Sequence, residues 1–185
     1  MEILLRSRRV VLEFLKNTPF SLPEALAVIL LYSCSVQNWL DGGEEVPLDP
    51  EATLEEARGY GERGSVESIF DFFSDLEILT DSWRSRLTQG PRRRDWDNAL
   101  YPLVIYGIHR YWLQAVSDYD LYCRVKYCIA SCILIRNLGG DLLATAQLYS
   151  KEIENNIDNV EAILDGAYSH PAFTDDKLLG LLLQK

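Results

Sequence analysis

Residues 96–138 decide the fold and read WDNALYPLVIYGIHRYWLQAVSDYDLYCRVKYCIASCILIRNL. They form two apolar segments rich in aromatic residues, separated by the polar residues 117–120. In the first segment the apolar residues recur every three or four positions, the period of a helix that buries one face: Leu100, Leu103, Val104, Ile108, Tyr111, Trp112 and Val116. The second segment repeats this spacing in Leu121, Val125, Cys128, Ile129, Cys132, Ile133 and Ile135. We therefore predict a central helical hairpin against which the other helices pack.

Periodic apolar segments continue on both sides of the hairpin, without strand-like alternation of any length. Helix-capping residues precede several of them, namely Ser21 with Glu24, Asp49 before Pro50, Ser65, Asp81 and Thr174. We predict an all-α, single-domain multi-helix bundle over residues 1–185. Its N-terminal helices occupy residues 1–90, and the central hairpin and C-terminal helices occupy residues 91–185.

One long helix is predicted from Asp141 to Gly166, because Gly139 and Gly140 break the chain before it and a glycine suits the end of a helix. Its predicted buried seam consists of Ala146, Tyr149, Ile153, Ile157, Val160 and Leu164. A polar stripe beside the seam consists of Glu152, Asn155, Asn156 and Asn159. In the first helix, we predict that Ile3, Val10, Val11, Phe14 and Leu15 line one buried side.

The charge balance limits the classes of partner. The 185 residues include 18 Lys and Arg against 28 Asp and Glu, a net charge of −10. This balance argues against nucleic acid or anionic lipid and favours a protein partner. The longest apolar run, residues 25–32, is far shorter than the roughly 20 residues of a membrane span. We expect no membrane partner and a cytoplasmic location.

Motifs for common chemistry are weak in this chain. Residues 59–64 match G-x-G-x-x-G but follow a charged segment instead of a buried strand, so we interpret them as an interhelical loop. Cys123, Cys128 and Cys132 lack a close C-x-x-C pair and are interpreted as core residues, as is Cys34. Neither histidine follows the Glu-x-x-His spacing of di-iron bundles. We predict no metal site and expect no cofactor within this chain.

Two charged groups remain as candidates for binding. Arg92 to Arg94, with Arg84 and Arg86, form a basic island that is either solvated loop charge or a docking site for a carboxylate or an acidic surface. Asp118 and Asp120 are either paired carboxylates or, as we favour, the residues that fix the turn and cap the second arm of the hairpin.

Two segments carry a resemblance to a known family. The run YGIHRYWLQAVSDYDLYCRVKYCIASCILIRNL and the later AQLYSKEIENNIDNVEAIL resemble the C-terminal part of flagellin lysine-N-methylases. The shared features are an aromatic helix ending in a Tyr/Asp turn, a basic and apolar helix, and a Tyr-Ser-Lys/Arg-Glu-x-Glu motif, here residues 149–154. The resemblance covers residues 96–164 well and the N-terminal half more loosely.

The resemblance implies methyl transfer from S-adenosylmethionine to lysines of flagellin by the full-length enzyme, with flagellin as the partner. Family members carry an N-terminal cysteine cluster, thought to hold an iron–sulphur centre, whereas Cys34 stands alone in this part of the chain. We expect either a C-terminal domain that lacks its cysteine-cluster region or a shortened homologue, not catalytic alone.

Within the resemblance, the candidate substrate-binding residues are Tyr149, Glu152 and Glu154, because a carboxylate attracts a lysine ammonium and an aromatic face can receive it. A structural role for them is the competing interpretation. Arg110, Asp118 and Asp120 are further candidates, as an ion-paired hinge between the two arms. The catalytic and cofactor-binding residues stay unassigned.

Two alternatives remain open. The chain can be an acidic all-helical interaction or ligand-sensing module without enzymatic activity. It can also hold a small molecule between its helices, in a pocket lined by Trp96, Tyr106, Tyr111 and Trp112, although such residues are more often core.

Overall fold

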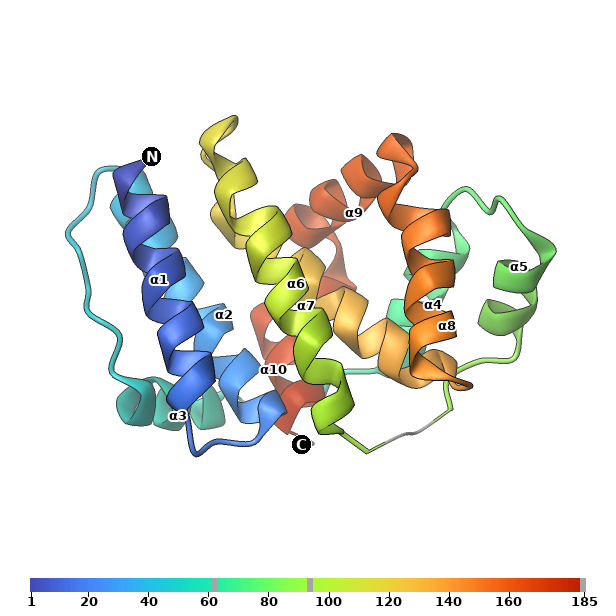
Figure 1. The fold of residues 1–185 in the computed structure, drawn as a ribbon, viewed down its shortest axis with the longest axis horizontal. Helices are drawn as coiled ribbons and strands as arrows, with labels where there is room; N and C mark the ends of the chain where they lie inside the picture. Colours follow the sequence, from blue (N-terminus) through green and yellow to red (C-terminus); the bar gives the residue numbers. More distant parts are fainter. Residues whose placement is uncertain (61–62, 93–94, 184–185) are drawn as a thin grey trace.

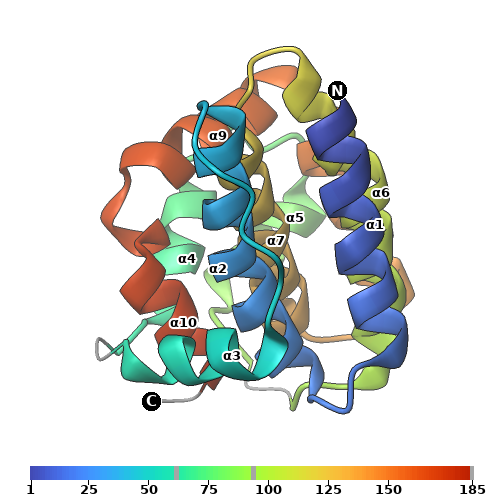
Figure 2. The ribbon, with the colours of Figure 1, turned by 90° about the vertical axis from the view of Figure 1, so that its left-hand side faces the viewer.

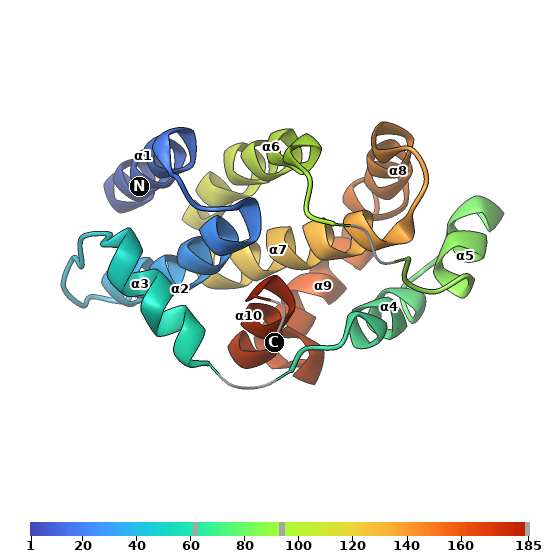
Figure 3. The ribbon, with the colours of Figure 1, turned by 90° about the horizontal axis from the view of Figure 1, so that it is seen from below.

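Helix α7 (Leu121–Leu138) lies in the middle of the structure, with α1, α6 and α8 on one side and α3, α4 and α10 on the other (Figure 3). The computed structural model describes residues 1–60, 63–92 and 95–183, and this part of the chain contains helices and no strand (Figure 1). The other α-helices are α1 (Glu2–Asn17), α2 (Leu22–Leu40), α3 (Pro50–Gly59), α4 (Val66–Ser74), α5 (Asp81–Thr88), α6 (Tyr101–Tyr111), α8 (Leu142–Tyr149), α9 (Ile157–Ser169) and α10 (Asp175–Leu183). The all-α prediction is confirmed.

The first arm of the predicted hairpin contains α6, preceded by the 3-10 turn η1 (Asn98–Leu100) and followed by the 3-10 helix η2 (Trp112–Val116). Its periodic apolar residues are buried at Leu100, Val104, Ile108, Tyr111 and Trp112, whereas Val116 is exposed. The indole Nε1 of Trp112 donates to the Ser7 Oγ of α1 over 3.1 Å, which ties the arm to the first helix.

The second arm, α7, is buried on nearly all sides, so the prediction of a single buried face is wrong for this helix. It packs against α2, α6, α9, α4 and α8, and these neighbours leave it almost no surface in water. Two of its charged residues, Arg124 and Lys126, are buried and have ion-pair partners. Lys126 Nζ, for example, lies 2.8 Å from Asp175 Oδ1 at the start of α10.

The long helix predicted for residues 141–166 is interrupted. After α8 the chain forms the π-helical turn η3 (Ser150–Glu154) and then breaks before α9. The Oδ1 of Asn156 accepts the N–H groups of Asp158 and Asn159, so it starts a new helix instead of continuing the old one. The new helix has a different rotation, and Ile157 of the predicted seam is 71% exposed. Gly166 lies inside α9 and packs against the ring of Phe72.

Two smaller differences concern helix α1 and a cap. Leu4 and Ser7 are buried on α1, whereas Val10 of the predicted side is exposed. Helix α5 is capped by Thr80, whose Oγ1 accepts the Trp83 N–H, and not by Asp81. The predicted caps at Ser21, Asp49 and Ser65 are confirmed.

Residues from both halves of the sequence share one hydrophobic core, from Leu4 of α1 to Leu182 of α10. Figure 1 shows α1, α2 and α3 together on the left and α4, α5 and α8 on the right, with α7 between the two groups. Figure 2 looks at the molecule from the left of Figure 1 and shows α2 in front of α7. Within the described ranges, no helix is both long and apolar enough to cross a membrane.

Candidate functional site

The π-helical turn η3 holds two of the candidate residues, and Tyr149 immediately precedes it. π-Helical turns are rare and often occur at functional sites, because they shift the direction of the side chains that follow. Here the Glu152 and Glu154 side chains point toward two separate polar clusters.

Glu152 is 0% exposed and serves the chain itself. Its carboxylate accepts the Leu79 N–H over 2.9 Å and the Thr80 hydroxyl, both from the segment that joins α4 to α5. Its backbone carbonyl accepts the Asn159 side chain at 3.0 Å. A substrate lysine has no access to this carboxylate, so its geometry supports the structural interpretation.

Glu154 lies on the other side of η3 and binds two tyrosines of α6. Its carboxylate accepts the hydroxyl of Tyr111 over 2.7 Å and that of Tyr106 over 3.1 Å. Arg110 Nε lies 3.9 Å from the same carboxylate, and the Arg110 guanidinium lies over both tyrosine rings. The structure thus brings Glu154 and Arg110 together, but the Glu154 side chain is only 6% exposed.

A chain of hydroxyl groups continues from this cluster into the core. The Tyr111 and Tyr127 hydroxyl oxygens are 3.3 Å apart, and those of Tyr149 and Ser131 are 2.5 Å apart. Burial raises the pKa of Tyr111 and of Tyr149, and it raises the pKa of Tyr127 to about 12. These tyrosines stay neutral at physiological pH, and Tyr149 holds the core together instead of facing a ligand.

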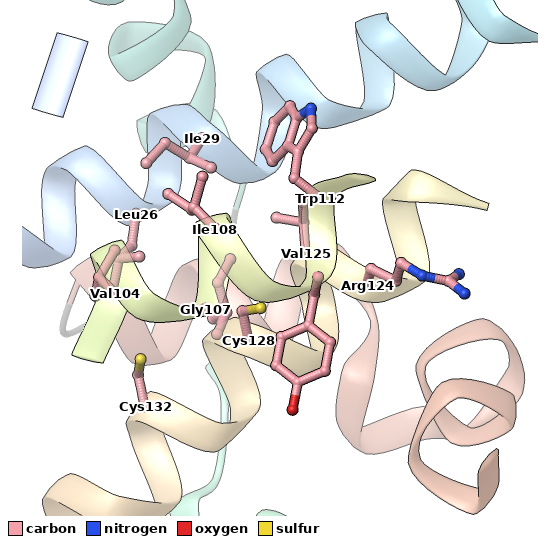
Figure 4. Close-up of a pocket in the computed structure, with 12 residues that line it drawn as sticks. Leu26, Ile29, Val104, Gly107, Ile108, Trp112, Arg124, Val125, Cys128 and Cys132 are labelled. Carbon is pink, nitrogen blue, oxygen red and sulfur yellow. The ribbon is translucent and has the colours of Figure 1, made fainter. Parts of the chain in front are cut away.

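The aromatic residues Trp96, Tyr106, Tyr111 and Trp112 do not line one common pocket in the described part of the chain. Trp112 and Tyr111 line a narrow apolar cavity between α2, α6 and α7, with the thiols of Cys128 and Cys132 nearby (Figure 4). Its volume is about 20 Å³, room for roughly one water molecule. Tyr106 is exposed on the surface. The cavity is therefore a packing gap and not a ligand site.

Asp118 and Asp120 lie at the turn between η2 and α7. Asp118 Oδ2 accepts from Arg124 Nη2 over 2.7 Å, and Asp120 Oδ1 accepts the Cys123 N–H over 3.0 Å as the cap of α7. Gln37 of α2 also stabilises the start of α7, because its Oε1 accepts the Leu121 N–H. The capping role predicted for Asp120 is confirmed, and the ion-paired partner of Asp118 is Arg124, not Arg110.

The same turn forms one wall of an open cleft of about 580 Å³ between the start of α7 and helix α9. The α9 wall carries Glu161 and Asp165, four residues apart and therefore on the same helix face. Tyr168, 85% exposed, also lines the cleft. Neither Glu161 nor Asp165 has an ion pair in the described part of the chain. The cleft can therefore receive a cationic side chain beside an aromatic ring.

Sequence reasoning missed the three α9 residues. Glu161, Asp165 and Tyr168 occupy the i, i+4 and i+7 positions of one face of α9, but the helix predicted from the sequence ended at Gly166, before Tyr168, and the face of Glu161 and Asp165 was assigned no role.

The remaining sequence features divide into core and surface. Cys123 and Cys132 are buried and Cys128 is partly buried, as predicted for core residues, whereas Cys34 is exposed. Within the described residues no three His, Cys, Asp or Glu side chains are arranged to bind a metal ion. In the G-x-G-x-x-G match, Gly59 ends α3 and Gly61 lies outside the described residues, as do Arg93 and Arg94 of the basic island.

Comparisons of the chain with protein-family models, with curated proteins and with solved structures found no match. The resemblance to flagellin lysine-N-methylases therefore depends on the quoted motifs alone.

Proposed function

We propose that this chain is the cytoplasmic helical module of a flagellin lysine-N-methylase-like protein and that it binds a lysine-bearing segment of flagellin in the cleft between α7 and α9. The observation that carries the proposal is the pair of unpaired carboxylates, Glu161 and Asp165, next to the exposed ring of Tyr168. A lysine ammonium gains from both groups, through charge attraction and through the face of the ring.

The Tyr-Ser-Lys-Glu-Ile-Glu motif has a scaffold role in this proposal. Glu152 accepts a hydrogen bond from the segment before α5, and Glu154 accepts one from α6. Both contacts hold the helices that surround α7, and α7 with α9 forms the cleft. The methyl donor S-adenosylmethionine and the iron–sulphur centre belong, in this proposal, to a cysteine-cluster region outside the chain.

A calorimetric titration with monomeric flagellin from the same source tests the binding step. Saturable binding is expected, and the double substitution E161Q/D165N should weaken it about tenfold, since two charge-assisted contacts lose their charge. The matched control is E51Q/E55Q, which removes two exposed carboxylates with the same i, i+4 spacing from α3. Absence of binding, or an equal loss in the control, contradicts the proposed cleft.

Methylation in the source cell tests the enzymatic part separately. Mass spectrometry of flagellin lysines should show reduced methylation when E161Q/D165N is introduced into the gene, and unchanged methylation with E51Q/E55Q. Unchanged methylation after deletion of the whole gene would contradict the methylase proposal. If the purified chain still bound flagellin although deletion of its gene left methylation unchanged, the chain would be better described as an acidic interaction module without enzymatic activity.

A further inference from the structure

A second open cleft, of about 710 Å³, lies between α5 and α8 at the end of α7. It shares no residue with the acidic cleft, and its charge is opposite. Two arginines, Arg86 and Arg92, line it together with the hydroxyl-bearing residues Ser82 and Ser85. Asp81 is the carboxylate in its lining.

A pair of glycines brings the two arginines close to the same backbone. Gly139 and Gly140 both have positive φ, at 73° and 79°, a conformation that glycine adopts without strain. A Cβ atom on Gly139 would lie 2.7 Å from Arg92 Cδ, and one on Gly140 would lie 3.1 Å from Arg86 Nη1. Both side chains therefore pack against backbone that only glycine leaves open.

Arg86 is held in a fixed orientation. Its Nη1 donates to the Gly139 carbonyl over 2.9 Å and to the Thr145 hydroxyl over 2.7 Å. These two bonds use both hydrogens of Nη1. The opposite edge of the guanidinium, formed by Nε and Nη2, has no hydrogen-bond acceptor in the described part of the chain. This edge carries two parallel N–H bonds, the geometry that matches the two oxygens of a carboxylate.

Arg92 is also anchored through its backbone. Its N–H donates to the Asn137 carbonyl over 2.7 Å, and its Nη2 donates to Gln89 Oε1 over 2.6 Å. Arg92 is exposed and lines the same cleft as Arg86. Two fixed cations in a chain of net charge −10 thus share one cleft.

We propose that the cleft between α5 and α8 binds the carboxylate group of a ligand through the free edge of Arg86 and the side chain of Arg92. Asp81 in the lining disfavours a second negative charge in the cleft. It makes a singly charged carboxylate a better ligand than a phosphate dianion. The proposal is independent of the flagellin proposal, because it uses no residue of the other cleft.

The test is a titration of the isotopically labelled chain with sodium acetate, followed through the NMR signals of the arginine Nε–H groups. Sodium chloride keeps the ionic strength constant, and inorganic phosphate is titrated in parallel. A saturable shift of the Arg86 signal is expected with acetate, with weaker binding of phosphate. R92Q should weaken acetate binding about tenfold, because a charged contact is lost.

The matched control is R84Q. Arg84 is exposed and lies in α5, as Arg86 does, but it does not line the cleft. It should leave acetate binding unchanged. R86K adds a second variant that keeps the charge but loses the two-bond edge, and circular dichroism checks its fold. If acetate gives no saturable shift, if phosphate binds more tightly, or if R84Q weakens binding as much as R92Q, the carboxylate site is refuted.

Discussion

Two pairs of carboxylates on neighbouring segments behave in opposite ways. Glu152 and Glu154 in η3 are turned inward and accept hydrogen bonds from the chain itself. Glu161 and Asp165 in α9 point into an open cleft and have no ion pair in the described residues. Position in a motif is therefore a poor guide to ligand contact. A carboxylate is available to a partner only where the fold has not already supplied its hydrogen-bond donors.

The inner pair should dominate stability, and Glu152→Ala should have the largest effect of any substitution proposed for these carboxylates. We expect the free energy of unfolding to fall by about 3 kcal/mol, because the Leu79 N–H and the Thr80 hydroxyl lose their buried acceptor. Urea unfolding followed by circular dichroism measures the loss. Glu51→Ala on the exposed face of α3 is the control. A loss no larger than that of the control would remove the distinction between inner and outer carboxylates.

The inner cluster also predicts a loss of stability at alkaline pH. Burial raises the pKa of Tyr127 from 10.0 to about 12, so the folded state keeps a proton that the unfolded state releases in this range. Because the folded state binds more protons, stability is fully present below pH 10 and falls as pH rises towards 12. The expected slope is about 1.4 kcal/mol per pH unit for this residue.

Urea unfolding at several values between pH 9.5 and 11.5, as approximate limits of the window, measures this slope. The variant Tyr127→Phe should have a shallower slope than the natural chain, since it has no proton to release. Equal slopes for the two proteins would show that Tyr127 does not contribute to the alkaline loss.

The break between the two pairs can be tested with two adjacent asparagines. Asn156→Ala should cost about 1 kcal/mol, because Asn156 caps α9 and also donates to Glu77 Oε2. Asn155→Ala should be close to neutral, since the Asn155 side chain is exposed and has no hydrogen bond in the described structure. In one continuous helix both substitutions would be neutral or slightly stabilising, so equal effects would contradict the observed break.

Local signals in the sequence were sufficient for most of the fold. The caps at Ser21, Asp49 and Ser65 act within three residues, and the apolar period of residues 100–112 reflects a helix with one buried face. The break at Asn156 was not predictable in the same way. Ile157 fits the period of a continuous helix, and Asn156 competes with that helix only because its side chain finds the N–H groups that follow and Glu77, 79 positions away.

The candidate site was predictable only where its contacts are local. The cap that Asp120 provides for α7 lies three residues away and was predicted, whereas the burial of Glu152 depends on Leu79 and Thr80, more than 70 positions distant. The outer pair was missed because the break changes which face of α9 meets α7. The apolar period of a sequence describes one helix at a time. It carries no information on which distant backbone groups that helix will contact.

The outer pair, Glu161 and Asp165, should contribute least to stability and most to recognition. E161Q/D165N should change the free energy of unfolding by less than about 0.5 kcal/mol, because neither side chain is buried or ion-paired in the described chain. The same variant should bind a lysine-containing flagellin peptide more weakly than the natural chain. Added salt should lower the affinity of the natural chain for this peptide towards that of the variant. Thermal unfolding and a peptide titration at two salt concentrations measure both effects on one preparation. A stability change as large as that of Glu152→Ala would mean that the outer carboxylates stabilise the fold. This result would contradict the proposal that the cleft binds a ligand.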